Sequence, residues 1–246
     1  MTTVADLNAH IHEASQQVLA WDKNPELMPA ISDTFECHIF VAPLNPSEEL
    51  QVKFAQVCKE NGMRALNVGL NFEKIGMATV LQSTKYYKVA NAKIAVERMI
   101  EDAKKLNEHF EVIRLKLESL ATNEGVPQTD EEAKNIPGDT YFEYHIKIKD
   151  APMSEESDKV LKNLSYQLTE ELQIRVPFSC NNLKDYQRFL NARTYHIGFQ
   201  NSFDKIKKVK AAIESKGYEI ERVISEFIVY DTNKKLDTGW LEYEAA

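Results

Sequence analysis

Two short stretches of the chain alternate between apolar and polar residues with a period of two. Their apolar positions are Phe35, Cys37, Ile39 and Val41 in the first stretch, and Phe142, Tyr144, Ile146 and Ile148 in the second. The positions between them include Glu36 and His38 in the first stretch, and Glu143 and His145 in the second. This period predicts β-strands that pack through one face only. Each strand should therefore carry a Glu and a His side by side on its other face.

Around these stretches the pattern changes between helical and strand periods in the same order twice. In the first half it predicts strands over residues 35–41, 65–72, 79–89 and 110–120, with helices over 45–61 and 91–109. In the second half it predicts strands over residues 141–150, 173–179, 193–199 and 218–230, with helices over 154–172 and 203–216. The order β-α-β-β-α-β is that of a ferredoxin-like unit.

Matching residues in the two halves lie at a nearly constant spacing. Glu36 and His38 lie 107 residues before Glu143 and His145. A spacing of 108 then links Tyr87 to Tyr195, Arg114 to Arg222 and Glu118 to Glu226. Such a small drift over a hundred residues indicates an internal duplication.

The predicted fold is therefore α+β, an internal duplication of a ferredoxin-like βαββαβ unit. Both helices of such a unit cover one sheet face, so the two lobes should turn their open faces toward a cleft or a barrel-like core. We expect the two Glu/His pairs to share that space. The predicted divisions are an N-terminal helix and connector (1–33), a first lobe (34–122), a linker (123–139), and a second lobe with a C-terminal hairpin extension (140–246).

Composition narrows the classes of partner and compartment. The formal net charge of −8 argues against a general nucleic-acid or membrane surface, although a small anionic ligand fits a local basic pocket. The three cysteines have no C-x-x-C spacing, which is typical of a reducing cytosol. With neither a signal-peptide core nor a run of membrane-spanning length, we expect a cytoplasmic protein. The sequence makes no prediction of oligomeric state.

The paired Glu/His faces are the sharpest candidates for chemistry. A carboxylate orients a histidine and keeps its pKa near neutrality, which suits acid–base work. We therefore take the catalytic candidates to be His38, His145, Glu36 and Glu143. The first and fourth strands of a ferredoxin-like unit are neighbours, which adds the ligand-binding candidates Arg114, Lys116, Glu118, Lys147, Arg222 and Glu226. The alternative interpretation is a solvated sheet face with cross-strand salt bridges.

One histidine on a strand of each of two related lobes resembles the arrangement in the two-histidine phosphoesterases. That resemblance implies metal-free hydrolysis of cyclic or 2′,5′ phosphodiesters, with His38 and His145 as acid and base. The family places Thr or Ser two residues after each histidine. Here Phe40 and Lys147 occupy those positions, so the hydroxyl groups that hold the phosphate are missing.

A metal is the second possibility, because Glu36, His38 and Glu118 are residue types that bind Zn²⁺, Fe²⁺ or Mn²⁺. His145 and Glu226 mirror this set in the second half. Arginines expected on the same faces would repel a cation, so we predict neither a metal nor a cofactor.

The predicted third strands supply a further ligand candidate. Arg193, Tyr195 and His196 combine basic and aromatic side chains, as Lys85 and Tyr87 do in the first half. Such a set suits a nucleotide base and its phosphate. The alternative is that the tyrosines belong to the core and the cations to its rim.

Together these observations favour a protein that binds a small phosphorylated ligand, for example a nucleotide, between two pseudo-symmetric lobes. If the protein is an enzyme, we expect a phosphoesterase-like hydrolase. The alternatives are a non-enzymatic protein-binding or scaffold module, and a metal-dependent enzyme that uses the Glu/His strand faces.

Overall fold

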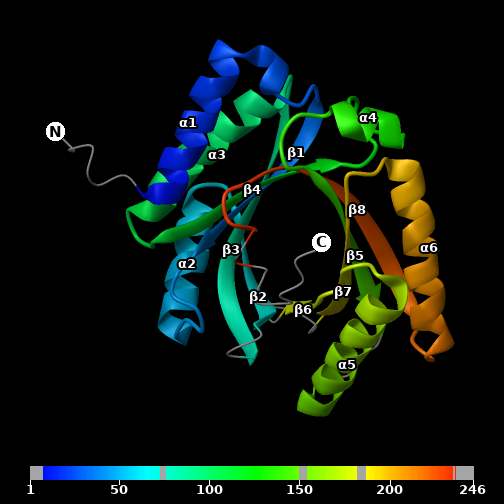
Figure 1. Cartoon of the computed structure of the whole chain (residues 1–246). Coiled ribbons are helices and arrows are strands. Elements are labelled where there is room, and N and C mark those ends of the chain that lie inside the picture. The colour runs from blue at the N-terminus through cyan, green and yellow to red at the C-terminus, as the bar shows by residue number, and fades with distance from the viewer. Residues whose placement is uncertain (1–7, 73–75, 150–153, 182–186, 235, 237–246) are drawn as a thin grey trace.

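A computed structural model of the chain shows a mixed helix-and-strand fold (Figure 1). It describes residues 8–72, 76–149, 154–181, 187–234 and 236. The elements of the first half are α1 (Ala9–Lys23), the short 3₁₀ helix η2 (Pro25–Leu27), β1 (Asp33–Val41), α2 (Glu48–Glu60), β2 (Arg64–Phe72), β3 (Gly76–Val89), α3 (Ala92–Asn107) and β4 (Val112–Leu120). The remaining elements are α4 (Asp130–Asn135), β5 (Tyr141–Ile148), α5 (Glu155–Leu172), β6 (Phe178–Asn181), β7 (Gln187–Tyr195), α6 (Phe199–Ser215) and β8 (Ile220–Asp231).

The strands of the described residues form a closed antiparallel barrel. Their order is β1-β3-β2-β6-β7-β5-β8-β4, with β4 pairing back to β1. Each half of the chain supplies four adjacent strands, and the halves meet where β2 pairs with β6 and β4 with β8. The prediction of an α+β fold with a barrel-like core is therefore confirmed.

Strand alternation decides which side chains face the barrel interior. On β1, Phe35, Cys37 and Ile39 are buried in the hydrophobic core, and α3 packs on this strand. The main helices lie outside the barrel, with α1, α2 and α3 along the first half and α5 and α6 along the second (Figure 1). Glu36 and His38 alternate with the core residues and point inward, as do Glu143 and His145 on β5. Both Glu/His pairs thus face away from the helices, as the pattern predicts.

The middle strands of the second half lie elsewhere than the pattern predicts. β7 covers Gln187–Tyr195 rather than residues 193–199, because His196 adopts a left-handed backbone (φ 56°) that ends the strand. α6 consequently begins at Phe199, four residues early. β6 covers Phe178–Asn181 rather than residues 173–179, and it follows Pro177, which has no amide hydrogen for a ladder.

The observed register changes one correspondence between the halves. Glu36 lies opposite Tyr86 on β3, and Glu143 lies opposite Arg193 on β7. The counterpart of Arg193 is therefore Tyr86, and the spacing of 107 residues persists through the third strand. Lys85 faces the helices instead, where its ammonium binds Asp102 of α3 at 2.8 Å.

The segment predicted as a linker contains a helix of its own. Thr129 and Glu132 form a capping box that starts α4. The Asp130 carboxylate then accepts hydrogen bonds from the backbone N–H of Gly198 and from the Asn201 side chain, each at 2.8 Å. These contacts attach α4 to the beginning of α6.

Two further sequence predictions concern a C-terminal hairpin and the lack of a run of membrane-spanning length. The C-terminal hairpin falls largely on residues 237–246, which lie outside the described residues. In the described part of the chain, no helix has the length and apolar character that crossing a membrane requires.

Replacing Gly198 with Ala should destabilise the protein by about 1–3 kcal/mol. A Cβ at this position would lie 2.2 Å from the carbonyl carbon of Thr129, so one backbone segment must move. Urea unfolding of Gly198→Ala beside the wild type measures the change. Gln200→Ala, at an exposed site two residues later, is the control and should change the free energy of unfolding by less than about 0.5 kcal/mol. Equal stability of Gly198→Ala and the wild type would contradict the close approach.

Candidate functional site

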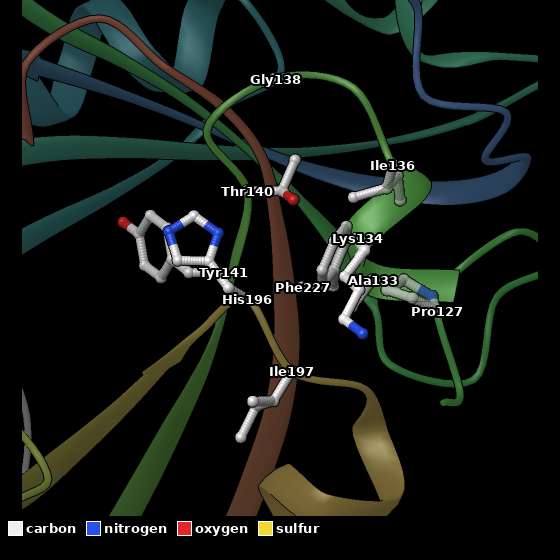
Figure 2. A pocket seen from close by; sticks show the side chains of 10 residues that line it. All are labelled: Pro127, Ala133, Lys134, Ile136, Gly138, Thr140, Tyr141, His196, Ile197 and Phe227. Atoms are coloured by element: carbon white, nitrogen blue, oxygen red, sulfur yellow. The ribbon is translucent and has the colours of Figure 1, made fainter. Parts of the chain in front are cut away.

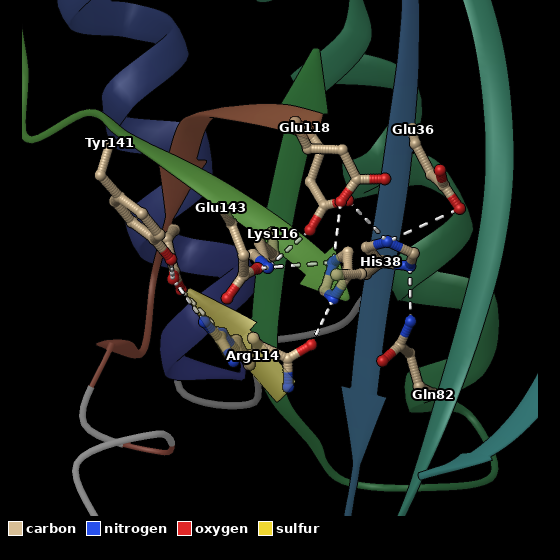
Figure 3. Close-up of polar contacts among 12 residues, drawn as sticks. Glu36, His38, Gln82, Arg114, Lys116, Glu118, Tyr141 and Glu143 are labelled. Carbon is tan, nitrogen blue, oxygen red and sulfur yellow. Dashed lines mark hydrogen bonds and ion pairs between the residues drawn. The ribbon is translucent and has the colours of Figure 1, made fainter. Parts of the chain in front are cut away.

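Charged side chains of both halves meet inside the barrel (Figure 3). We call this set the interior network, and it comprises Glu36, His38, Arg114, Lys116, Glu118, Glu143, His145, Arg193, Glu226 and Asp231. The side chains are mostly buried, and each takes part in an ion pair. A solvated sheet face, the alternative considered from sequence, does not describe them.

His38 is the buried histidine of the network. Its Nε2 lies 3.1 Å from a Glu118 oxygen and 3.7 Å from a Glu36 oxygen. Its Nδ1 lies 2.7 Å from the Gln82 amide nitrogen and 3.0 Å from the Thr84 hydroxyl. Burial acts to lower the pKa of His38, but the two carboxylates outweigh it, so this pKa is raised. The two carboxylates thus favour the protonated form of His38.

His145 is the more accessible histidine, with 30% of its side chain exposed compared with 10% for His38. Its Nδ1 donates to the Asn191 carbonyl oxygen at 2.6 Å, while the Asn191 amide nitrogen donates to Ser179. Asn191 thereby fixes Nδ1 as the protonated nitrogen and leaves Nε2 facing Glu226 at 2.9 Å. Burial acts to lower the pKa of His145, but the carboxyl groups of Glu226, Glu143 and Glu118 together outweigh it and raise this pKa to about 10.

The two His–Glu pairs are connected through their carboxyl groups. Glu118 and Glu226 share a hydrogen bond, so the four side chains form a continuous chain from His38 to His145. Burial and the nearby Glu118 raise the pKa of Glu226 to about 7. Burial alone would also raise the pKa of Glu118, but Lys116 and His38 hold it well below its usual value. A proton between the two carboxyl groups therefore resides on Glu226.

Lys116 links the halves of the barrel. Its ammonium binds Glu118 on its own strand at 2.5 Å and also Glu143 on β5 (Figure 3). Arg193 binds the other oxygen of Glu143 at 2.5 Å. Burial opposes the charge on Glu143, but Arg193 and Lys116 prevail and lower its pKa to about 2. Glu143 is therefore held as an anion between two cations.

Arg114 is likewise held by a carboxylate. Its guanidinium binds the two oxygens of Asp231 at 2.8 and 2.5 Å, and Tyr141 donates its hydroxyl to the same carboxylate at 3.2 Å. The expected contact between Arg114 and His38 does not occur, because Lys116 takes the position opposite His38. Asp231 and Arg114 lie 117 residues apart, and the sequence pattern does not predict that they form an ion pair.

With all five of its carboxyl groups ionised, the network is neutral only when both histidines are protonated, whereas with a proton on Glu226 one protonated histidine is enough. Its carboxylates are Glu36, Glu118, Glu143, Glu226 and Asp231, and its permanent cations are Arg114, Lys116 and Arg193. Two imidazolium rings supply the remaining positive charge. The raised pKa values of His38 and His145 agree with this balance.

The other predicted ligand residues lie at the edges of the barrel. Lys147 follows His145 on the same strand face and pairs with Glu221 at 2.8 Å, and exposed Arg222 lies opposite Lys147. Tyr195 and His196 are exposed at the far end of β7, where the Tyr195 ring packs on Tyr141, and Arg193 lies over the same Tyr141 ring.

Two sets of donor atoms have the spacing that a metal ion needs. They are Glu36, His38 and Glu118, and Glu118, Glu143 and His145, with each set lying within 4.8 Å. Lys116 already binds Glu118 and Glu143, so an ion in the second set would displace its ammonium. The first set is the better candidate for a cation.

The sequence analysis missed the side chains that orient the histidines. Gln82 and Thr84 contact His38, and Asn191 contacts His145. Thr84 and Asn191 occupy equal positions opposite the two histidines. A correct register for the third strands would have found them.

Replacing Glu143 with Gln should destabilise the protein by about 3–5 kcal/mol, because Lys116 and Arg193 lose a shared buried carboxylate. Urea unfolding at neutral pH measures the loss. Glu219→Gln breaks an exposed ion pair with Lys149 and should cost less than about 1 kcal/mol. Similar losses in both variants would contradict the importance of the buried pair.

The free energy of unfolding should fall as pH rises from neutrality toward about 10, where His145 titrates in the folded protein. The ordinary histidine pKa is 6.5, so the folded state holds a proton in this range that the unfolded state lacks. The slope from this group is at most about 1.4 kcal/mol per pH unit. Urea unfolding at several pH values measures it. His145→Gln should reduce the slope of the unfolding free energy against pH, and His12→Gln, at an exposed site, should leave that slope unchanged. Parallel curves for His145→Gln and the wild type would contradict the assignment.

No family model matches the chain, and no curated protein sequence matches it. Among the solved structures that align with it are two of low similarity. One is a candidate transcriptional repressor of the glycine cleavage system, 10% identical over 80% of this chain and 98% of its own, with a TM-score of 0.25. The other is a candidate monooxygenase from Lactobacillus acidophilus NCFM, 13% identical over 80% of this chain and 94% of its own, with a TM-score of 0.26. TM-scores this low carry no argument about fold or function.

Proposed function

We propose that the protein binds a small phosphorylated ligand at the His145 end of the barrel and hydrolyses its phosphoester by acid–base chemistry. The observation that carries this proposal is the exposure, tautomer and hydrogen-bond partner of His145. It is the more exposed of the two network histidines, Asn191 fixes its tautomer, and its Nε2 faces a carboxyl group whose pKa is about 7. A histidine so oriented exchanges a proton at one defined atom.

The reaction would use His145 first as an acid. Its pKa of about 10 keeps it protonated at neutral pH, so Nε2 can give a proton to the leaving oxygen as the phosphorus–oxygen bond breaks. Water forms the new bond to phosphorus and releases a proton, which returns to the His145–Glu226 pair. The pair thus ends the cycle in its starting protonation state.

Lys147 and Arg222 are the proposed contacts for the phosphate. They lie opposite each other on β5 and β8, next to His145 on the barrel wall. The sequence analysis favoured Arg114 together with Arg222, but Asp231 binds Arg114 and carboxylates also hold Lys116 and Arg193. A phosphate inside the network would displace those buried carboxylates, whereas a phosphate on Lys147 and Arg222 would displace only the exposed Glu221.

His38 has a positioning role in this proposal. Its side chain is 10% exposed and reaches His145 only through Glu118 and Glu226. Its positive charge helps to keep Glu118 ionised, and the proton between the carboxyl groups then stays on Glu226. His38 would therefore tune the proton affinity of the acid–base pair without touching the ligand.

The two-lobe organisation, with lobes at 34–122 and 140–246, is part of the same proposal, and we attribute it to duplication. Its support is the equal placement of the paired side chains. Glu36 lies opposite Glu118, and Glu143 lies opposite Glu226, each between a first and a fourth strand. Only the second copy would have kept an accessible histidine.

Hydrolysis of bis(4-nitrophenyl) phosphate and 4-nitrophenyl phosphate tests the reaction. His145→Gln should lower kcat by a factor of about 10²–10⁴, because the proton donor is lost. The double variant Lys147→Gln, Arg222→Gln should chiefly raise KM. His12→Gln, at an exposed site on α1, should behave as the wild type. An unchanged rate in His145→Gln would remove this residue from the mechanism.

The non-enzymatic alternative predicts a different result. If the protein only binds its ligand, both esters stay intact, while nucleoside monophosphates still raise the melting temperature. A ligand at 100 times its Kd adds about 2.7 kcal/mol of apparent stability. If neither hydrolysis nor a thermal shift occurs, a protein partner or scaffold role is favoured over both.

A further inference from the structure

A pocket of about 390 Å³ lies outside the interior network (Figure 2). Its walls come from three segments: the stretch that contains α4, the beginning of β5, and the turn between β7 and α6, with one residue from β8. The lining residues that matter here are Ala133, Lys134, Ile136, His196, Ile197 and Phe227. This volume is in the range of pockets that bind small organic molecules.

The walls of the pocket are held together by hydrogen bonds. Asp130 accepts from the Gly198 backbone and from Asn201, each at 2.8 Å. The Phe199 backbone N–H also donates to the Pro127 carbonyl oxygen at 2.9 Å. α4 is therefore fixed to the beginning of α6, and the space between them exists before a ligand arrives.

The lining combines an apolar interior with a lysine and a histidine at its exposed side. Phe227 and Ala133 are buried, and Ile136 and Ile197 are partly buried. Lys134 and His196 are exposed residues that also line the space. Lys134 pairs with Glu131 at 3.3 Å, and both side chains are more than 60% exposed, so this pair is weak and easily exchanged.

His196 has a left-handed backbone. Its φ of 56° lies in the region that asparagine, aspartate and histidine adopt most often after glycine. The exposed His196 ring lies beside the Tyr195 ring, with the two centroids 6.4 Å apart, and it also lines the pocket.

We infer that this pocket binds a small amphipathic anion. Its apolar body would lie against Phe227, Ile136 and Ile197, and its anionic group would meet Lys134 and His196. The site is separate from the proposed acid–base site. His196 follows the end of β7 and the pocket adjoins the beginning of β5, whereas Lys147 lies at the other end of β5. Tyr141 lies between the pocket and the network, because it lines the pocket while its hydroxyl binds Asp231.

Titration with 1-naphthoate tests the inference. The control probe is 1-naphthamide, which has the same naphthalene ring but no charge. Fluorescence or calorimetry gives both affinities. We expect the carboxylate to bind more tightly, and Lys134→Gln to weaken it about three- to fivefold without affecting the amide. Lys207→Gln is the matched control, since Lys207 is also an exposed lysine paired with an acidic residue three positions earlier. His196→Asn, which suits the left-handed backbone, should also weaken the carboxylate alone.

Ala133→Leu fills the pocket and should abolish binding of both probes. A thermal melt of the variant shows whether it folds, and Lys134→Gln keeps the test informative if it does not. His145→Gln should leave naphthoate affinity unchanged, which separates this site from the proposed hydrolase. The inference is overturned if 1-naphthoate fails to bind at millimolar concentration, or if its affinity is the same in wild type, Lys134→Gln and Ala133→Leu.

Discussion

The ammonium group of Lys116 is the contact on which the rest of the barrel interior depends. It binds Glu118 of the first half and Glu143 of the second, and all three side chains are almost fully buried. Buried charges are tolerated only when they are paired and hydrogen-bonded. The two halves must therefore close around this lysine together. Arg193 binds Glu143, His38 binds Glu118, and Glu226 shares a hydrogen bond with Glu118. The positions of these three side chains therefore follow from the two carboxylates that Lys116 binds.

Sequence reasoning worked where a short-range pattern determines the structure. The alternation around Glu36 and Glu143 assigns the inward face, because the opposite choice would expose a row of apolar side chains. It failed where the determinant is a long-range contact. Nothing local joins Arg114 to Asp231, or Lys116 to Glu143, since barrel closure alone brings them together. The error in β7 has a different cause. The left-handed residue His196 ends the strand earlier than the pattern predicts, so Asn191 lies inside β7 but outside the predicted strand.

The two halves carry similar residues but differ in chemistry. Opposite Glu36 lies a tyrosine, and opposite Glu143 lies an arginine. Glu143 is consequently bound between two cations and loses its basic character, while Glu36 lies near His38, the Tyr86 hydroxyl and Glu118. One histidine is enclosed and the other is accessible. A symmetric sequence pattern therefore predicts the location of such a site better than the role of each member.

Closure of the barrel has a consequence for the surface of the protein. A strand at the free edge of a sheet offers unpaired amide and carbonyl groups to any other chain, and this is a common route to aggregation. In the described barrel every strand has a neighbour on both sides, so the backbone presents no such template. The protection is uneven, because β2 and β6 pair at three positions whereas β4 and β8 pair at five. Among the described strands, the shorter seam is where the backbone is less shielded from a foreign strand.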